Sequence, residues 1–374
     1  MRTKRGAAGD RIRRERQGNA VVVGASCAGL MASLALSRAG IDVTLLEKAT
    51  VFPHAGGAIG GVSEPLLERI TGRKRTVRDT TTDTDGQPWF AVYTRLRSAV
   101  DDEPHITFRH ARVTSVGQDA DRAWATTTDG NTYTGDVVIG ADGHRSVVRR
   151  AVAPDKPDAT FAGYVIWLGL ADESAIASRH RWPHDTDILY RRNDCLLGYP
   201  LPSREGSLTP GTRRIGFAWY DASRNDLMRE LGCVRDTVAH HTLAAADVPA
   251  TTLRELAVEV DGLWPALWRD VIHHCLDQRT VIGAPIAEYL PDHLVNGRLA
   301  LVGDAGHVPT PMTGSGFGMA LQDAEVLAEA VADGLDGRDM ALALQRYEHA
   351  RLDSVRATVH SGQRFSRSFA GRAG

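Results

Sequence analysis

The chain has 374 residues and a net charge of −2, and 43% of its residues are hydrophobic and 24% charged. This length favours a large core arranged in two lobes, and the balanced charge gives no sign of a nucleic-acid partner or of a trap for acidic substrates. No apolar run reaches the roughly 18 residues that cross a bilayer, so no membrane partner is expected.

The N-terminal segment and the cysteines indicate where the protein works. Residues 1–18 are basic and lack both apolar periodicity and the apolar stretch of a signal peptide, so a disordered tail is predicted. The cysteines are widely spaced and form no C-x-x-C motif, which argues against a disulfide framework and against a metal site. A reducing, cytoplasmic location is therefore expected. The cysteines are Cys27, Cys195, Cys233 and Cys275.

After the tail, the chain predicts a βαβ unit. Residues 20–24 form an apolar strand, residues 27–39 a helix that Gly40 ends, and residues 42–46 a second strand. A glycine-rich and proline-rich loop follows. Beyond it we expect helices at 64–71 and 89–100, a small antiparallel meander from 105, and a buried strand at 137–139.

The middle of the chain differs in character from both ends. Residues 161–275 contain strand-like pieces followed by helical stretches, and they hold five of the seven tryptophans. A strand at 299–302, a glycine-rich turn and two helical segments, near 319–331 and 338–366, come after it. Dinucleotide-like signals occur both early and late, so one domain is predicted to be discontinuous. The expected division is a tail at 1–18, a cofactor domain at 19–160 and 276–335, an inserted substrate domain at 161–275 and a C-terminal helical segment at 336–374.

The turn GASCAG differs by one residue from the dinucleotide fingerprint G-x-G-x-x-G. Gly24 makes the tight turn, Gly29 permits close packing of helix on strand, and Ser26 stands where the backbone must approach a pyrophosphate at the helix N-terminus. Glu47 ends the second strand, 23 residues after Gly24, and suits a carboxylate that accepts ribose hydroxyls. An ordinary glycine turn is the simpler interpretation. With the βαβ context and Glu47, an adenine dinucleotide is predicted, and NAD and FAD both remain open at this point.

Two further motifs resolve that choice through a family resemblance. Residues 140–149 read GADGHRSVVR, and residues 303–324 read GDAGHVPTPMTGSGFGMALQDA. Together with GASCAG, in this order, they resemble the three fingerprints of the class A flavoprotein aromatic hydroxylases, over about residues 20–335. The resemblance implies an α/β fold: a Rossmann-like FAD-binding domain of the p-hydroxybenzoate hydroxylase type, with an inserted β-sheet substrate domain and a C-terminal helix.

The same resemblance assigns expected roles in the third motif. Asp304 is implied to hydrogen-bond a ribityl hydroxyl of FAD, and Pro311 to lie beside the flavin ring. Gly314 and Gly316 are implied to begin a helix aimed at the flavin, where a helix N-terminus stabilises the negative charge of the reduced ring.

Two earlier positions also match family contacts. Val113 matches a position that touches the adenine through its backbone. Asp142 is implied to serve the FAD pyrophosphate region and nicotinamide-cofactor use, and it fits a structural turn residue equally well.

The middle region narrows the resemblance to one branch. The stretches FAGYVIWLGL, GYPLP, IGFAWY and WPALWRDVI resemble the dihydroxypyridine hydroxylases, in which the serine variant of the first loop also occurs. Relatives that act on hydroxynicotinate have a histidine where this chain has Gly60. His54, six residues earlier, is the remaining candidate base, against the alternative of a solvent-exposed loop histidine.

Aromatic residues of the middle region are the candidate substrate contacts. Trp167, Tyr199, Trp219 and Tyr220 are expected around an aromatic ring, and Tyr199 or Tyr220 is a candidate proton relay. The alternative for each of them is an ordinary core aromatic.

The resemblance implies a monooxygenase. NADH or NADPH reduces FAD, molecular oxygen adds to give a flavin C4a-hydroperoxide, and a small, electron-rich, hydroxypyridine-like ring takes one oxygen atom. The alternatives are a flavin reductase or oxidase of the same fold, and a non-catalytic flavin-binding sensor. Monomer and homo-oligomer are both compatible with the sequence.

Overall fold

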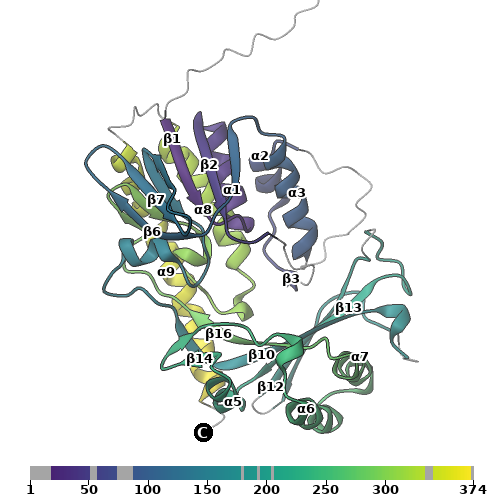
Figure 1. Ribbon diagram of the computed structural model, residues 1–374. Helices are drawn as coiled ribbons and strands as arrows, with labels where there is room; N and C mark the ends of the chain where they lie inside the picture. Colours follow the sequence, from purple (N-terminus) through teal and green to yellow (C-terminus); the bar gives the residue numbers. More distant parts are fainter. Residues whose placement is uncertain are drawn as a thin grey trace, which may run out of the picture.

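The computed structural model describes residues 18–50, 57–73, 87–177, 181–191, 194–203, 206–332 and 340–371. Two lobes lie one above the other and share a long C-terminal helix (Figure 1). Almost all of the basic tail lies outside the described residues, and so does the candidate base His54. No helix in the described ranges is long and apolar enough to cross a membrane.

The upper lobe is built on a six-stranded sheet of order β17-β18-β9-β1-β2-β5. All neighbouring strands are parallel except the short edge pair β17 and β18. The chain leaves this sheet after β9 and returns to pair β18 against β9, so the lobe is discontinuous in sequence. The strands are β1 (Gly18–Val23), β2 (Ile41–Glu47), β5 (Ile106–His110), β9 (Val137–Gly140), β17 (Val295–Asn296) and β18 (Leu299–Leu301).

Different layers cover the two faces of this sheet. Val22 and Leu45 pack toward α1, α2, α3 and α8, whereas Val21 and Leu46 pack toward the meander β6-β7-β8 and α4. A sheet that is buried on both faces has apolar residues at successive positions, which explains the continuous apolar runs in β1 and β9. These covering elements are α1 (Cys27–Arg38), α2 (Glu64–Thr71), α3 (Trp89–Asp101), α4 (Val147–Val152), α8 (Gly316–Val331), β6 (Val113–Gln118), β7 (Ala123–Thr127) and β8 (Thr132–Gly135).

The lower lobe contains a seven-stranded antiparallel sheet. Its main strands run in the order β11-β12-β13-β10-β16, and the small pair β14 and β15 joins at β10. The strands are β10 (Thr160–Asp172), β11 (Asp187–Arg191), β12 (Asp194–Leu201), β13 (Arg214–Asp221), β14 (Val234–Arg235), β15 (Val238–Ala239) and β16 (Ile282–Glu288). β16 lies beyond residue 276, where the sequence predicted a return to the cofactor domain. Its long-range pairing with β10 leaves no signal in the local sequence, which is why the structure differs from the predicted boundary.

Three helices cover the lower face of this sheet, and its upper face looks toward the other lobe (Figure 1). The helices are α5 (Asn225–Glu230), α6 (Ala250–Leu263) and α7 (Ala266–Asp277). The remaining short elements are the strands β3 (Ala58–Ile59) and β4 (Gln87–Pro88), and the 3-10 turns Glu173–Ala175, Ala245–Asp247, Gly303–Ala305 and Pro311–Thr313.

Helix α9 (Met340–Ala370) connects the lobes. At 31 residues it is about 46 Å long. In its first half the Tyr347 hydroxyl donates to the Leu301 carbonyl of β18, and near its end Phe369 packs edge-on against Tyr164 of β10. Gly362 allows close passage, because a Cβ there would lie 2.8 Å from Thr310. The helix therefore fixes the spacing of the two lobes.

Candidate active site

The first glycine turn leaves no room for side chains. Gly24 has φ +99°, and a Cβ on it would lie 2.4 Å from the Ala141 carbonyl oxygen. A Cβ on Gly29 would lie 1.8 Å from the carbonyl oxygen of Gly24 itself. Ser26 caps α1 with an exposed side chain that makes no capping hydrogen bond. The turn thus presents free N–H groups and one free hydroxyl at a helix N-terminus, which suits a pyrophosphate.

Glu47 is held beside this turn by backbone N–H groups. Its buried carboxylate accepts from Ala25 N at 2.6 Å and from Ala49 N at 2.7 Å. Each carboxylate oxygen retains a further lone pair, so ribose hydroxyls can still be accepted. The Glu47 carbonyl accepts from Ala111 N at 2.8 Å, which brings Val113, the first residue of β6, to the same end of the sheet.

The structure accounts for Asp142 within the protein. Its carboxylate accepts from Ser146 Oγ at 2.5 Å and from Val147 N at 2.7 Å, so it caps the N-terminus of α4. Burial raises the pKa of Asp142, and these hydrogen bonds act in the opposite direction. The interpretation of Asp142 as a structural turn residue accounts for the hydrogen bonds of both its carboxylate oxygens.

Arg149, at the end of the second motif, is a buried residue that connects two motifs and that the sequence did not single out. Its fully buried guanidinium donates to Pro157 O at 2.8 Å and to Ala305 O at 3.0 Å, and it lies over the Tyr289 ring. These contacts join the second motif to the third. Nothing in the run SVVR indicates an inward-facing charge, because the partner Ala305 lies 156 positions away in sequence.

Asp304 differs from Asp142 in having no internal partner. Its side chain is exposed, and its carboxylate makes no hydrogen bond to any described residue. Surrounding protein displaces water and raises the pKa of Asp304, while His307, His144 and Arg149 favour its charged form. An unengaged carboxylate at this place fits the expected bond to a ribityl hydroxyl.

A buried network of charged groups holds the third motif in place. Asp323 of α8 is fully buried and accepts from Gly303 N at 2.9 Å and from Arg351 Nε of α9 at 2.8 Å. His307 Nε2 lies 2.6 Å from the same carboxylate. The charges of His307 and Arg351 hold the pKa of Asp323 below its usual value despite burial. Asp323 therefore connects the turn before Asp304 to two helices.

The start of α8 faces the space between the lobes. Pro311 and Gly314 lie in the turn that precedes this helix, and Gly316 is its first residue. Gly314 has φ +60°, which favours glycine. A Cβ on Gly61 would lie 3.3 Å from the Gly314 carbonyl, so the loop after β3 packs closely against this turn. The N-terminus of α8 then presents positive partial charge to the space between the lobes.

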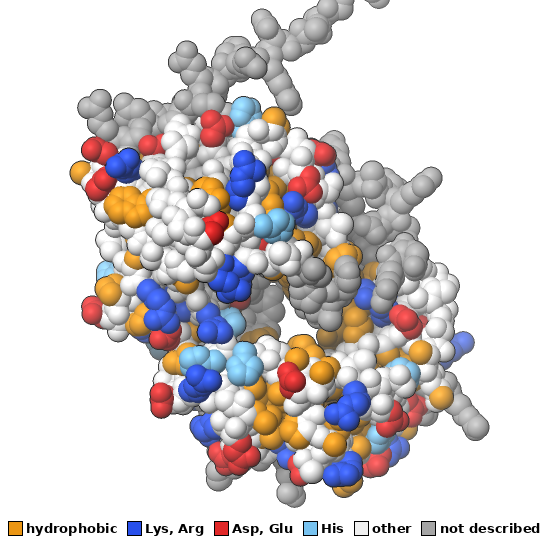
Figure 2. All heavy atoms as spheres, in the orientation of Figure 1, with side chains coloured by type: hydrophobic (Ala, Val, Ile, Leu, Met, Phe, Trp, Pro, Cys, Tyr) orange, Lys and Arg blue, Asp and Glu red, His pale blue; other side chains and the backbone are white. Residues whose placement is uncertain are grey.

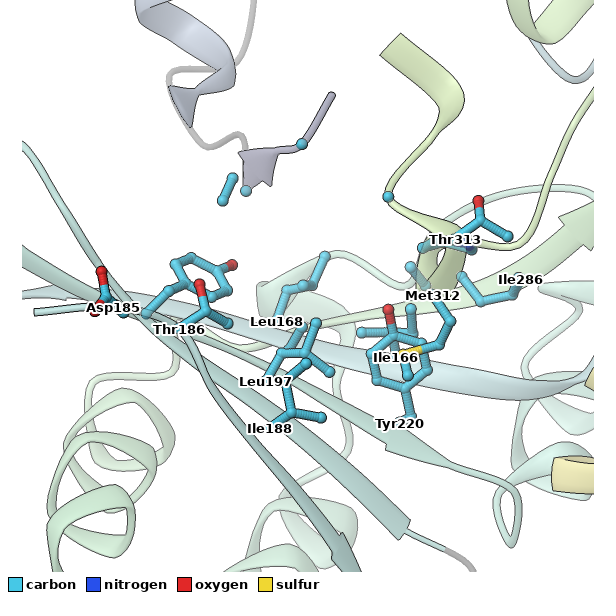
Figure 3. Close-up of a pocket in the computed structure, with 18 of the residues that line it drawn as sticks. Ile166, Leu168, Asp185, Thr186, Ile188, Leu197, Tyr220, Ile286, Met312 and Thr313 are labelled. Carbon is cyan, nitrogen blue, oxygen red and sulfur yellow. The ribbon is translucent and has the colours of Figure 1, made fainter. Parts of the chain in front are cut away.

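A cavity of about 690 Å³ lies between this turn and the lower sheet. Figure 2 shows the hollow between the lobes, and Figure 3 shows the cavity from close by. Gly57, Ala58 and Gly60 lie on its wall, so the position that lacks the relatives' histidine belongs to the cavity. Its apolar floor comes from alternate residues of five strands, and sequence analysis did not identify them: Ile166, Leu168, Ile188, Leu197, Ala218, Ala284 and Ile286.

Tyr199 and Tyr220 line this cavity, as expected for candidate substrate contacts. The Tyr199 ring lies over Gly216, where a Cβ would approach it to 2.5 Å. The Tyr220 hydroxyl has no hydrogen-bond partner in the described ranges, and its ring rises from the sheet floor (Figure 3). Burial raises the pKa of Tyr199 to about 12 and that of Tyr220 well above its usual value. Both phenols are neutral near pH 7.

Trp167 and Trp219 are placed differently from the prediction. Both side chains point to the opposite face of the sheet, where they are buried in the core beneath α6 and α7. The Trp167 indole donates to Asp221 and the Trp219 indole to Asp194, at 3.1 and 2.7 Å. Successive residues of a strand alternate between faces, so neither tryptophan can share the cavity face with Tyr220. The expected substrate contacts of the two tryptophans are therefore corrected.

Comparisons with known proteins agree with this geometry. An FAD binding domain family matches residues 18–64 and 270–361, and an FAD binding domain-like family matches residues 161–259. The chain is 28% identical over 371 residues to 2,6-dihydroxypyridine 3-monooxygenase of Paenarthrobacter nicotinovorans, covering 91% of this chain and 88% of that protein. It is 28% identical over 373 residues to the FAD-dependent urate hydroxylase of Klebsiella pneumoniae, covering 91% and 87%.

Solved structures share the fold. The 2,6-dihydroxypyridine-3-hydroxylase from Arthrobacter nicotinovorans superposes with a TM-score of 0.77 at 23% identity, over 96% of this chain and 94% of that one. A salicylate hydroxylase superposes with a TM-score of 0.70 at 18% identity, over 96% and 90%.

These matches and the three motifs place the chain in the class A flavoprotein aromatic hydroxylases, of the p-hydroxybenzoate hydroxylase fold. It is an FAD-dependent monooxygenase, and the predicted fold class and cofactor are confirmed. The turn whose Gly24 and Gly29 leave no room for a Cβ and the unengaged carboxylate of Asp304 fit FAD in this chain's own residues.

Proposed function

We propose that this enzyme hydroxylates an electron-rich aromatic or heteroaromatic ring of the hydroxypyridine type, with NADH or NADPH as reductant and oxygen as co-substrate. The observation that carries the proposal is a single cavity. On one side it has the turn Pro311–Thr313 before α8, and on the other an apolar sheet floor with two tyrosines. The relatives are named for dihydroxypyridine, urate and 3-hydroxybenzoate, which supports a ring with oxygen substituents.

As part of this proposal, we assign residues of this chain to the parts of FAD that they would contact. Gly24, Ser26 and Gly29 would receive the pyrophosphate, Glu47 the ribose hydroxyls and Asp304 a ribityl hydroxyl. When bound, FAD supplies oxygen activation and the transfer of one oxygen atom to the ring. Val113 would approach the adenine through its backbone.

The chain's residues would organise the reaction in the cavity. The N-terminus of α8, at Gly314 and Gly316, favours negative charge on the bound ring system. The apolar floor excludes water and holds the substrate ring in place. Because Tyr199 and Tyr220 are neutral, they would orient a ring hydroxyl by donating or sharing a hydrogen bond, and neither would act as a base near pH 7.

The remaining expectations fit this role. The FAD-binding part is proposed to be discontinuous around the inserted sheet. All four cysteines are buried and unpaired, which supports a reducing, cytoplasmic location.

Purification and isotope labelling test the proposal. The protein should be yellow, and NAD(P)H oxidation should accelerate when a hydroxypyridine, phenol or aniline from a panel is added. With labelled oxygen gas, one labelled atom should appear in the product by mass spectrometry. Substrate-stimulated NAD(P)H oxidation without label in the product would identify a reductase or oxidase instead, and protein that cannot be loaded with FAD contradicts the proposal.

A further inference from the structure

The cavity floor extends past the tyrosines to the edge of the sheet. Strand register places Leu168 opposite Ala218, Ala218 opposite Leu197, and Leu197 opposite Ile188. All four side chains line the cavity, so they form one apolar row across four strands. The row ends at Ile188 on β11, which is the edge strand.

This end of the row is open to solvent. Ile188 is 52% exposed although it lines the cavity, and Tyr190, two residues along on the same face, is also 52% exposed. Leu189, between them, packs into the helix-covered core. Ile188 and Tyr190 therefore point to the opposite face of the sheet. A half-exposed apolar strip that leads out of a cavity offers contact area to a ligand longer than one ring.

Polar residues form the rim at the same end. His184, Asp185 and Thr186 line the cavity, and all three are exposed. Figure 3 shows Asp185 and Thr186 at the opposite end of the cavity from Met312 and Thr313, which lie beside the start of α8. The carboxylate of Asp185 attracts a cation or a hydrogen-bond donor and repels another carboxylate.

We propose that the substrate is an elongated molecule rather than a single ring. Its reacting ring lies near Met312 and Tyr220, an apolar extension covers Leu197 and Ile188, and a cationic or hydrogen-bond-donating group ends at Asp185. This inference rests on the proposed function, because it assumes that the reacting ring lies at the α8 end of the cavity.

Binding to the FAD-loaded enzyme without NAD(P)H tests the inference apart from turnover. Four ligands share one head group: phenol, 4-butylphenol, 4-(4-aminobutyl)phenol and 4-(4-hydroxyphenyl)butanoate. Each is titrated by isothermal calorimetry and by the change in flavin absorbance. Because each buried methylene contributes up to about fourfold, the butyl chain should tighten binding at least about tenfold over phenol, even on a half-exposed strip. The aminobutyl ligand should bind about fivefold more tightly than the butanoate.

Two variants assign these gains to residues. Ile188→Thr keeps a β-branched residue in the strand and should weaken 4-butylphenol binding about threefold more than it weakens phenol binding. Asp185→Asn should remove the preference for ammonium over carboxylate. Asp226→Asn is the matched control, because its side chain is 90% exposed on α5, on the helix-covered side of the sheet.

Several results would overturn the inference. They are equal binding of phenol and 4-butylphenol, a preference for the butanoate, equal effects of Asp185→Asn and Asp226→Asn, or no binding of the series to FAD-loaded protein. Incorporation of labelled oxygen into a single-ring substrate would still support the proposed function in each of these cases. A protein that holds no FAD would contradict both.

Discussion

The lower sheet carries aromatic residues on both faces, and the faces differ in whether the polar atoms of these residues are hydrogen-bonded within the protein. Beneath the sheet, the indoles of Trp167 and Trp219 each donate to an aspartate, and the helices seal them from solvent. Above it, Tyr220 keeps a hydroxyl with no partner among the described residues, at a cavity. Beneath the sheet these two indoles are paired within the protein, whereas above it Tyr220 has a hydroxyl left for a ligand.

An aromatic residue with a structural role therefore differs from a candidate substrate contact in that its polar atom is already hydrogen-bonded within the protein. Buried polar atoms in a folded protein are nearly always paired, so a paired indole needs no ligand to explain it. The two aspartates of the FAD-binding motifs differ in the same way. Asp142 is engaged in a helix cap, and Asp304 is not engaged.

Truncation on the helix-covered face should have the largest effect. Trp219→Ala should lower the free energy of unfolding by about 3–5 kcal/mol, because it opens a cavity in the core and leaves Asp194 without its donor. Urea unfolding of the FAD-loaded protein measures this loss. The comparison variant is Tyr220→Phe, which should change stability by less than about 1 kcal/mol, and equal losses would contradict the distinction between the faces.

Removal of the unengaged carboxylate should affect the cofactor rather than the fold. Asp304→Ala should weaken FAD binding about 10- to 100-fold, since hydrogen bonds to charged groups contribute about 1.5–3 kcal/mol. Fluorescence titration of the apoprotein with FAD measures the affinity. As a contrast, Asp142→Ala should destabilise the apoprotein by about 0.5–2 kcal/mol through loss of the α4 cap. Unchanged FAD affinity in Asp304→Ala would remove its assigned role.

Asp194, which accepts a hydrogen bond from Trp219 beneath the sheet, should also make the stability of the protein depend on pH. Burial raises the pKa of Asp194 from 3.8 to about 6, the Trp219 hydrogen bond opposes this shift, and Asp221 adds to it. The folded state therefore favours the protonated acid, so this group's contribution to stability is present below pH 4 and is lost as the pH rises to about 6.

Asp194→Asn should remove this loss, because the amide oxygen still accepts from the Trp219 indole. The variant should be more stable than the parent by about 2 kcal/mol above pH 6, after allowance for partial exposure, and should lose this advantage near pH 4. Unfolding curves of both proteins between pH 4 and 8 test this, and a pH-independent difference would be inconsistent with it.

The smallest effect is expected above the sheet. Tyr220→Phe should weaken substrate binding about fivefold, which corresponds to one neutral hydrogen bond, with stability nearly unchanged. Because the pKa of Tyr220 lies well above 10, the variant should keep the parent's pH–rate profile between pH 6 and 9. A shifted profile would mean that the phenol titrates in this range, contrary to its burial.

The sequence predicted the features that depend on neighbouring residues, and it did not predict the contacts between residues far apart in the chain. The turn at Gly24 and Gly29 lies within a strand–turn–helix of about a dozen residues, so its geometry could be predicted from neighbouring residues. The cofactor was identified because the three motifs together resemble those of a known family. Contacts between distant residues could not be read in this way. Arg149 reaches Ala305 across 156 positions, and Arg351 reaches Asp323 from another helix.

The sequence alone therefore determined the fold class, the cofactor and the class of enzyme, because three short motifs in a fixed order resemble those of a known family. Only the tertiary structure decided which aromatics meet the cavity. In GYVIWLGL both faces of the strand are apolar, so alternation places Ile166 and Trp167 on opposite sides without showing which side the helices cover. The packing of α6 and α7 on one face left Tyr220 to the cavity and Trp219 to the core.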